Sequence, residues 1–261
     1  MLRKYPRTPH LVGSRLQPGD ADLASVPFTE LAGQYLVVEE KLDGANAAIS
    51  FDADGELLLQ SRGHYLAGGP RERQFGQFKA WAATVRHLLA PILRDRYVLY
   101  GEWLYAKHTV FYDALPHYFC EFDVYDRAED SFLSTKARQD MLAGSPITSV
   151  PILGEGKVAT LADLTALVGP STCRTARWRD TLATVARAQG LDPAHVADET
   201  DKADEMEGLY VKIERGGETV GRVKWVRRSF LTSILDVGTH WMDRPILPNQ
   251  LADPEALYAD L

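Results

Sequence analysis

The sequence predicts an α+β fold in which antiparallel sheets are flanked by helices. Short apolar runs are separated by turn-forming residues, such as Asp52-Ala53-Asp54-Gly55 and Gly216-Gly217, and this pattern is typical of β-hairpins. One long segment, residues 75–89, instead repeats aromatic and aliphatic residues at helical spacing. The runs predicted to be strands are 35–38, 47–51, 56–60, 97–105, 118–125, 208–213 and 219–226.

The remaining segments differ from this pattern. Residues 1–34 are rich in proline, glycine and polar residues, and we expect an extended N-terminal arm with one short strand. Residues 35–230 then form the main domain, which is interrupted by a helical insert at about 134–206, and 231–261 form a short, proline-rich tail. Further helices are predicted near 135–143, 161–168, 178–189 and 230–236.

Composition narrows the classes of function. The chain has 261 residues and a net charge of −7, which argues against non-specific nucleic-acid binding over the whole surface but leaves room for a local basic groove. It has only two cysteines, too few for a disulfide framework, and no apolar run approaches the roughly 20 residues that span a bilayer. We therefore expect a cytoplasmic protein with no membrane contact.

One short stretch has the pattern of a reactive site. The apolar run that begins at Tyr35 leads into Lys41, and Asp43 and Gly44 suit a tight turn directly after it. A partly desolvated lysine at a strand end favours the neutral amine, which is nucleophilic. The alternative is a surface hairpin with a solvated lysine.

Five later stretches add charged or aromatic residues at strand ends. Glu102 ends an apolar run, and a carboxylate close to a core usually has a partner. Arg222 and Lys224 are two residues apart in a strand, so they share a face. Taken singly, these residues have plainer interpretations as solvated strand faces or core packing. The five stretches are Ser61-Arg62-Gly63, Gly101-Glu102, Phe122-Asp123, Glu207-Gly208-Leu209-Tyr210-Val211-Lys212 and Arg222-Val223-Lys224.

Together with Glu40-Lys41-Leu42-Asp43-Gly44-Ala45-Asn46, these stretches resemble the ordered motifs of the covalent lysine nucleotidyltransferases. The resemblance covers residues 35–228 and is greatest to the ATP-dependent RNA ligases. It implies a nucleotidyltransferase (ATP-grasp-like) ligase catalytic domain, ATP bound as AMP on Lys41, and Mg²⁺ or Mn²⁺. It also implies RNA with 5′-phosphate and 3′-hydroxyl ends as substrate, and an end-healing kinase or phosphatase as a partner.

The same resemblance assigns expected roles to single residues. Lys41 would be the nucleophile, Asp43 would hold the turn, and Lys212 and Lys224 would screen the α-phosphate and depress the pKa of Lys41. Glu207 and Glu102 would orient the metal through waters. The residues expected to bind the nucleotide are Glu40, Asn46, Arg62, Glu102, Phe122, Glu207 and Arg222, with Phe122 stacking on adenine, Glu102 reaching the ribose and Arg227 as a further candidate cation.

The chain also departs from the family pattern. Arg222 stands where many ligases have a lysine, which leaves Lys224 as the favoured phosphate contact. The tail is too short for the OB domain that DNA ligases append. RNA ends would then be held by the helical insert or by the cations of the arm: Arg3, Lys4, Arg7, His10 and Arg15. An ATP-dependent DNA ligase, a GTP-using capping enzyme and a catalytically inactive nucleotide- or nucleic-acid-binding module remain alternatives.

Overall fold

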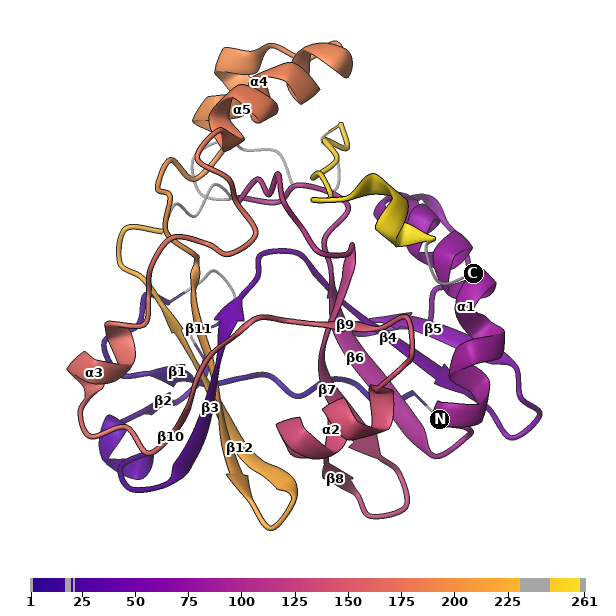
Figure 1. Ribbon diagram of the computed structural model, residues 1–261, viewed down its shortest axis with the longest axis vertical. Coiled ribbons are helices and arrows are strands. Elements are labelled where there is room, and N and C mark those ends of the chain that lie inside the picture. The colour runs from indigo at the N-terminus through magenta and orange to yellow at the C-terminus, as the bar shows by residue number, and fades with distance from the viewer. Residues whose placement is uncertain (1, 17–19, 21, 231–244, 259–261) are drawn as a thin grey trace.

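Two sheets form the body of the protein (Figure 1). In the computed structural model, residues 2–16, 20, 22–230 and 245–258 are described. Sheet A has the order β10 (Ile152–Gly156), β3 (Tyr35–Lys41), β11 (Gly208–Arg215), β12 (Glu218–Val226), β1 (His10–Leu11) and β2 (Ser25–Val26). Sheet B has the order β5 (Leu57–Ser61), β4 (Ala45–Phe51), β6 (Tyr97–Trp103), β7 (Phe119–Asp126) and β8 (Ser131–Phe132), while β9 (Thr148–Ser149) also pairs with β7.

Most neighbouring strands are antiparallel, and the predicted hairpins β4–β5 and β11–β12 are confirmed. Among the described residues, every parallel pair involves at least one strand of two residues: β1 pairs with β12 and with β2, and β9 pairs with β7. The hairpins form where the sequence places turn residues between β-branched and aromatic runs, so local chemistry is enough to define them. The α+β fold with mainly antiparallel sheets is thus confirmed.

The segment after Lys41 is a crossing between the sheets. β3 pairs with β10 and β11 in sheet A, whereas β4 pairs with β5 and β6 in sheet B. Gly44 lies at this crossing, and a Cβ there would lie 2.6 Å from the carbonyl oxygen of Trp103 on β6. Only glycine permits such a close approach. The alternative of a surface hairpin is therefore wrong, because the two strands belong to different sheets.

The longest of the described helices packs on sheet B. Helix α1 packs Phe78, Trp81, Val85 and Leu89 against sheet B, along whose outer face it runs (Figure 1). Pro91 lies inside its last turn, so the helix continues two residues beyond the position expected for its end. No helix in the described ranges is long and apolar enough to cross a bilayer. The helices are α1 (Gly76–Leu93), α2 (Thr135–Leu142), α3 (Leu161–Thr165), α4 (Trp178–Ala188) and α5 (Pro193–Asp198), with 3-10 turns η1 (Phe28–Glu30), η2 (Pro70–Phe75) and η4 (Pro254–Leu257).

The arm and the insert are more integrated than the sequence pattern suggested. Residues 1–34 contribute two short strands, β1 and β2, to one end of sheet A. The stretch 134–206 contains the predicted helices α2, α3 and α4, but it also supplies β9 to sheet B and β10 to sheet A. Strands this short carry little periodicity, so pattern alone does not reveal them. The helix expected near 230–236 falls on residues 231–236, which lie outside the described residues.

Candidate functional site

A cavity of about 620 Å³ lies between the two sheets at the crossing after Lys41. This volume is in the range of small-molecule sites. Strands of both sheets contribute to its wall, since β3 and β12 belong to sheet A while β4, β6 and β7 belong to sheet B. Eight predicted site residues line it: Glu40, Lys41, Asp43, Asn46, Arg62, Glu102, Phe122 and Lys224. Residues scattered over the sequence are thus brought into one pocket.

Lys41 is paired with Glu207. The register of β3 and β11 places Gly208 opposite Lys41, so the preceding Glu207 lies beside the lysine, with Nζ 2.7 Å from Oε1. Burial alone would lower the pKa of Lys41, but the carboxylates of Glu207, Glu102 and Asp43 outweigh it and raise that pKa. The pKa of Lys41 is therefore raised and not depressed, contrary to expectation, and the lysine is held as an ammonium.

The carboxylates around Lys41 are crowded into a dry site. Burial raises the pKa of Glu102 to about 8 and that of Glu207 to about 7, because the attraction of Lys41 only partly offsets the loss of water. Glu102 accepts a hydrogen bond from the backbone N–H of Gly44 at 3.1 Å. Asp43 Oδ2 accepts from the N–H groups of Thr109 and Val110, both at 2.7 Å. Asp43 thereby fixes the crossing to the loop that follows β6.

The residues present fit a hydrated divalent cation better than a closed metal cage. Within the described residues, no three His, Cys, Asp or Glu side chains are arranged to hold a metal ion. The charge of Asp43, however, adds to the raised pKa of both Glu102 and Glu207, and the charge of Glu207 adds to that of Glu102, so a cation would relieve the repulsion within this group of carboxylates. Magnesium keeps several waters and binds one or two carboxylates together with substrate phosphates. Glu102 lines the cavity and matches that preference, whereas Glu207 is fully buried beside Lys41 and, contrary to expectation, does not line the cavity.

Three further cavity residues offer groups that suit phosphate or ribose. Lys224 on β12 contributes a nearly buried ammonium. Asn46 on β4 has a buried Oδ1 with no hydrogen-bond partner among the described residues, which leaves it an acceptor for a ligand. Arg62 lies exposed at the cavity wall, just after β5. These positions agree with the expected roles without testing them.

The aromatic end of the cavity includes residues that sequence reasoning missed. Phe122 lies with its ring 5.1 Å from Tyr5 and 6.2 Å from Tyr210, and all three line the cavity. The Tyr210 hydroxyl is hydrogen-bonded to Thr8 at 2.7 Å and to Tyr5 at 2.6 Å. Nothing in the pattern of the arm singles out Tyr5 or Thr8, since only the tertiary fold brings that segment here.

Glu39 and Glu40 are neighbours in strand β3, so their side chains point to opposite faces and have different partners. Glu39 lines the cavity, and its buried Oε2 has no partner among the described residues. Its position two residues before Lys41, on the same strand face, was a signal that could have identified it. Glu40 borders the cavity, but its carboxylate accepts from Ser171 Oγ at 2.5 Å and from Thr172 Oγ1 at 2.6 Å. The structure thus gives Glu40 a role in anchoring the 171–172 loop.

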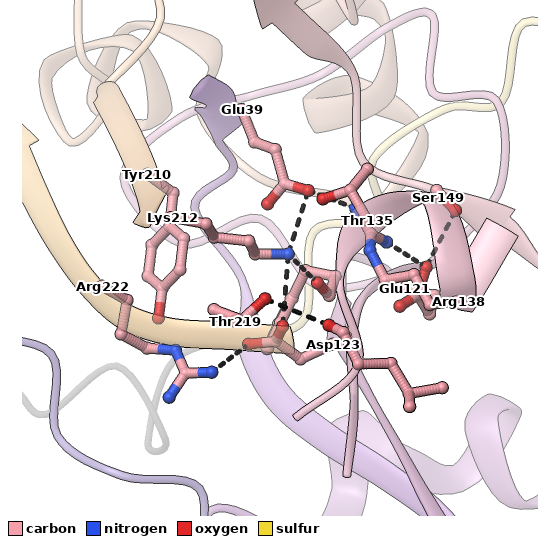
Figure 2. Close-up of polar contacts among 12 residues, drawn as sticks. Glu39, Glu121, Asp123, Thr135, Arg138, Ser149, Tyr210, Lys212, Thr219 and Arg222 are labelled. Atoms are coloured by element: carbon pink, nitrogen blue, oxygen red, sulfur yellow. Dashed lines mark hydrogen bonds and ion pairs between the residues drawn. The ribbon is translucent and has the colours of Figure 1, made fainter. Parts of the chain in front are cut away.

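Lys212 and Arg222 do not line the cavity, contrary to expectation. Figure 2 shows both in a buried network of ion pairs between the sheets. Lys212 Nζ donates to the carbonyl oxygen of Phe122 and lies 3.0 Å from Glu39 Oε1 and 3.3 Å from Asp123 Oδ1. Arg222 lies 3.3 Å from Asp123 and stacks on Phe132. Buried carboxylates attract both cations, so neither reaches the pocket.

Arg138 from α2 completes this network by joining the two sheets. Its guanidinium bridges Glu39 of β3 and Glu121 of β7, and all three side chains are fully buried (Figure 2). Ser149 Oγ donates to Glu121 at 2.8 Å. The cations of Arg138, Lys212 and Arg222 thus face the carboxylates of Glu39, Glu121 and Asp123, which balances charge in a largely buried region. The sequence showed these residues only as scattered charges.

The fold and family are identified by comparison with known proteins. Solved structures of Naegleria gruberi RNA ligase are similar: a mutant with AMP and Mn is 18% identical with a TM-score of 0.55 over 88% of this chain and 57% of that chain. The structure with PPi is 19% identical with a TM-score of 0.51 over 77% and 52%. This chain thus spans about half the length of these neighbours, which share its fold. No curated protein matches it. The RNA ligase family model matches residues 34–226, and the chain belongs to that family.

Proposed function

We propose that this protein is an ATP-dependent RNA ligase that joins 5′-phosphate and 3′-hydroxyl ends through a lysine-AMP intermediate. The observation that carries the proposal is the position of Lys41 in a cavity between the sheets, surrounded by a carboxylate cluster, a second lysine and an aromatic end. A binding module would not need a lysine at this point. The Naegleria neighbours, bound to ATP or AMP with Mn, support the choice of nucleotide and metal.

The chemistry consists of three displacements at phosphorus. First, the neutral amine of Lys41 forms a P–N bond with the α-phosphate of ATP while pyrophosphate leaves. Next, an oxygen of the RNA 5′-phosphate attacks the same phosphorus, and the amine of Lys41 leaves. Finally, the 3′-hydroxyl attacks the activated 5′-phosphate, and AMP leaves as the phosphodiester forms. Lys41 must therefore lose its proton and its contact with Glu207 before the first step.

The chain's own residues supply the remaining functions. Lys224 neutralises the charge that develops on the α-phosphate, and Asn46 orients the sugar or phosphate through its free Oδ1. Phe122 packs against the base. Glu207 and Glu102 would hold a hydrated divalent cation, which supplies positive charge to the phosphates. The required ends imply that an end-healing kinase or phosphatase prepares the RNA.

Intact-protein mass spectrometry after incubation with ATP and Mg²⁺ or Mn²⁺ tests the first step. We expect a gain of one adenylate on Lys41 and none in the Lys41→Arg variant, whose guanidinium keeps the positive charge beside Glu207 but is not a nucleophile. Protein treated with pyrophosphate beforehand serves as the starting material, because it carries no prior adenylate. Labelling of Lys41→Arg to the wild-type extent would overturn the proposal.

Sealing assays then test the substrate. Nicked duplexes with RNA or DNA at the reacting 3′-hydroxyl strand, together with single-stranded RNA, are compared at equal concentrations with an adenylate-loaded enzyme. We expect RNA at the 3′-hydroxyl to be joined fastest. Equal or faster joining of all-DNA nicks would instead assign the protein to DNA ligation, while leaving the lysine chemistry intact.

A further inference from the structure

Lys224, the candidate phosphate cation, is held by a partner outside the cavity. Its Nζ forms an ion pair with Asp20 Oδ2, and both residues are 8% exposed. Asp20 comes from the N-terminal arm, 204 residues away in sequence. It does not line the cavity, whereas Lys224 does. Lys224 thus reaches the cavity while its Nζ is paired with a carboxylate that is not part of the cavity wall.

His10 is the second member of this arrangement. It lies opposite Lys224 in the parallel pair of β1 and β12, and the backbone N–H of Lys224 donates to the carbonyl of Pro9 at 2.9 Å. His10 is fully buried, with Nε2 3.1 Å from Asp20 Oδ2 and Nδ1 2.7 Å from Ser14 Oγ. A carboxylate oxygen only accepts hydrogen bonds, so the proton lies on Nε2 and Nδ1 accepts from the Ser14 hydroxyl.

The chain of hydrogen bonds begins and ends on the same strand. The backbone N–H of Val226 donates to Ser14 Oγ at 2.9 Å, Ser14 to His10, His10 to Asp20, and Asp20 accepts from Lys224. Val226 and Lys224 both belong to β12, so the arm is attached at two points two residues apart. The geometry restrains the direction of the Asp20 carboxylate, because His10, Asp20 and Lys224 are buried and Ser14, which is half-buried, holds His10 from its other ring nitrogen.

The electrostatics of the pair favours a charged Lys224 and a neutral His10. Burial lowers the pKa of Lys224, and the charge of Lys41 lowers it further, while Asp20 opposes both effects. Burial also lowers the pKa of His10, which keeps the imidazole neutral and able to donate a single hydrogen bond to Asp20. Without Asp20, Lys41 and Lys224 would lie in the same cavity, and Lys224 would lose the carboxylate that favours its charged form. A cation must stay charged and aimed at the phosphate to stabilise it.

We propose that Asp20 is a positioning residue that keeps Lys224 charged and directed into the nucleotide cavity, and that His10 orients Asp20 for this task. The inference rests on the proposed function, since Lys224 serves there as the phosphate cation. It gives His10 and Asp20 of the arm a role in positioning Lys224, separate from any contact with RNA. Arg7, which was expected among the RNA contacts, forms ion pairs with Asp22 and Asp20.

The main test compares Asp20→Asn with Asp22→Asn. Asp22 lies two residues away, but its carboxylate is 69% exposed and pairs with Arg7, so it is a matched control for the same substitution in the same segment. We expect Asp20→Asn to slow single-turnover adenylation at saturating ATP by about tenfold or more, as loss of an aligned catalytic group does, and Asp22→Asn to leave the rate unchanged. Equal rates for the two variants would overturn the proposal.

A rescue experiment separates orientation from simple loss of fold. In His10→Gln the side-chain amide can still donate to Asp20 from near the position of Nε2, whereas His10→Ala removes the donor. We expect His10→Gln to retain most of the adenylation rate and His10→Ala to lose about as much as Asp20→Asn. If the two His10 variants behave alike while both remain folded by circular dichroism, His10 has no part in orienting Asp20.

A double-mutant cycle on stability makes the contact testable without any catalysis. The unfolding free energies of Asp20→Asn, Lys224→Met and the double variant are measured by urea denaturation. We expect the double variant to lose less stability than the sum of the single losses, because the pair is one interaction. Additive losses would overturn the Asp20–Lys224 pairing. Absence of adenylation in the wild type would instead count against the proposed function, with this cycle still deciding the pairing.

Discussion

The Nζ atom of Lys41 lies 2.7 Å from Oε1 of Glu207, and antiparallel pairing of β3 with β11 sets this distance. Lys41, the nucleophile of the proposed reaction, is therefore one member of an ion pair. Glu207 is fully buried, so neither charge could exist there at low cost without the other. The pair holds the lysine in place as an ammonium, which is not a nucleophile.

The carboxylates beside Lys41 predict a strict need for a divalent cation. Chelation with EDTA should abolish adenylation, and Mn²⁺ or Mg²⁺ added in excess should restore it. Glu102→Ala should raise the metal concentration for half-maximal adenylation by about tenfold or more, since groups that hold or orient a metal are worth this much in affinity. Titration of the adenylation rate with Mn²⁺ measures the shift. The exposed Glu129→Ala is the control, and an identical metal dependence for both variants would contradict the metal assignment.

Gly44 should not tolerate a side chain. A Cβ at this position would lie 2.6 Å from the carbonyl of Trp103 and 2.8 Å from Leu104 Cδ2. Gly44→Ala should destabilise the protein by about 1–3 kcal/mol, as overpacking does, and slow adenylation because Asp43 and Glu102 move. Urea denaturation and the mass assay measure both effects. In Gly76→Ala nothing lies within 4 Å of the new Cβ, so both values should stay at the wild-type level.

Arg138 should be a large single contributor to stability. Arg138→Met would leave Glu39 and Glu121 buried without their shared cation, at a cost of about 3–5 kcal/mol in unfolding free energy. Lys136→Met lies in the same helix α2, where its ion pair with Asp140 is exposed, and should change stability by less than about 0.5 kcal/mol. Urea denaturation of both variants measures these changes in unfolding free energy. A loss below about 1 kcal/mol for Arg138→Met would mean that the network contributes little.

Because of His117, the stability of the protein should decrease as the pH is lowered. Burial lowers its pKa to about 4, against an ordinary value of 6.5, so the folded state binds fewer protons than the unfolded state between these values. Its contribution is thus complete above pH 6.5 and is lost as pH falls toward 4, by about 3 kcal/mol in total. His117→Asn keeps an acceptor for the N–H of Phe119 and should flatten the pH dependence of unfolding free energy. Parallel curves for the two proteins would contradict this account.

Much of the fold could be predicted because its signals are local. β4 and β5 are joined by turn residues, and α1 shows an apolar stripe at helical spacing, so both elements were predicted close to their observed bounds. The site residues that were predicted and do line the cavity, such as Lys41, Glu102 and Lys224, lie at or near strand ends in a recognisable order. The order of these motifs along the chain was enough to predict that these residues belong to one site.

The errors concern residues whose partners are distant in sequence. Lys212 and Lys224 both looked like phosphate cations, yet Lys212 is drawn into the Glu39–Asp123 network while Lys224 enters the cavity. Alternation predicts which face a side chain takes, but not which carboxylate it meets there. Tyr5 and Asp20 were missed for the same reason, because their roles depend on where the arm returns to the sheet.

By itself, the sequence determined the hairpins, the long helix, the position of the candidate lysine and the ordered set of motifs that resembles the family of the chain, because each depends on neighbours along the chain. Only the tertiary structure decided that β3 and β4 belong to different sheets, that Lys41 is paired with Glu207, and that Asp20 holds Lys224. These features depend on the burial of charges, and a charge that loses its water must find a partner wherever the fold brings one close.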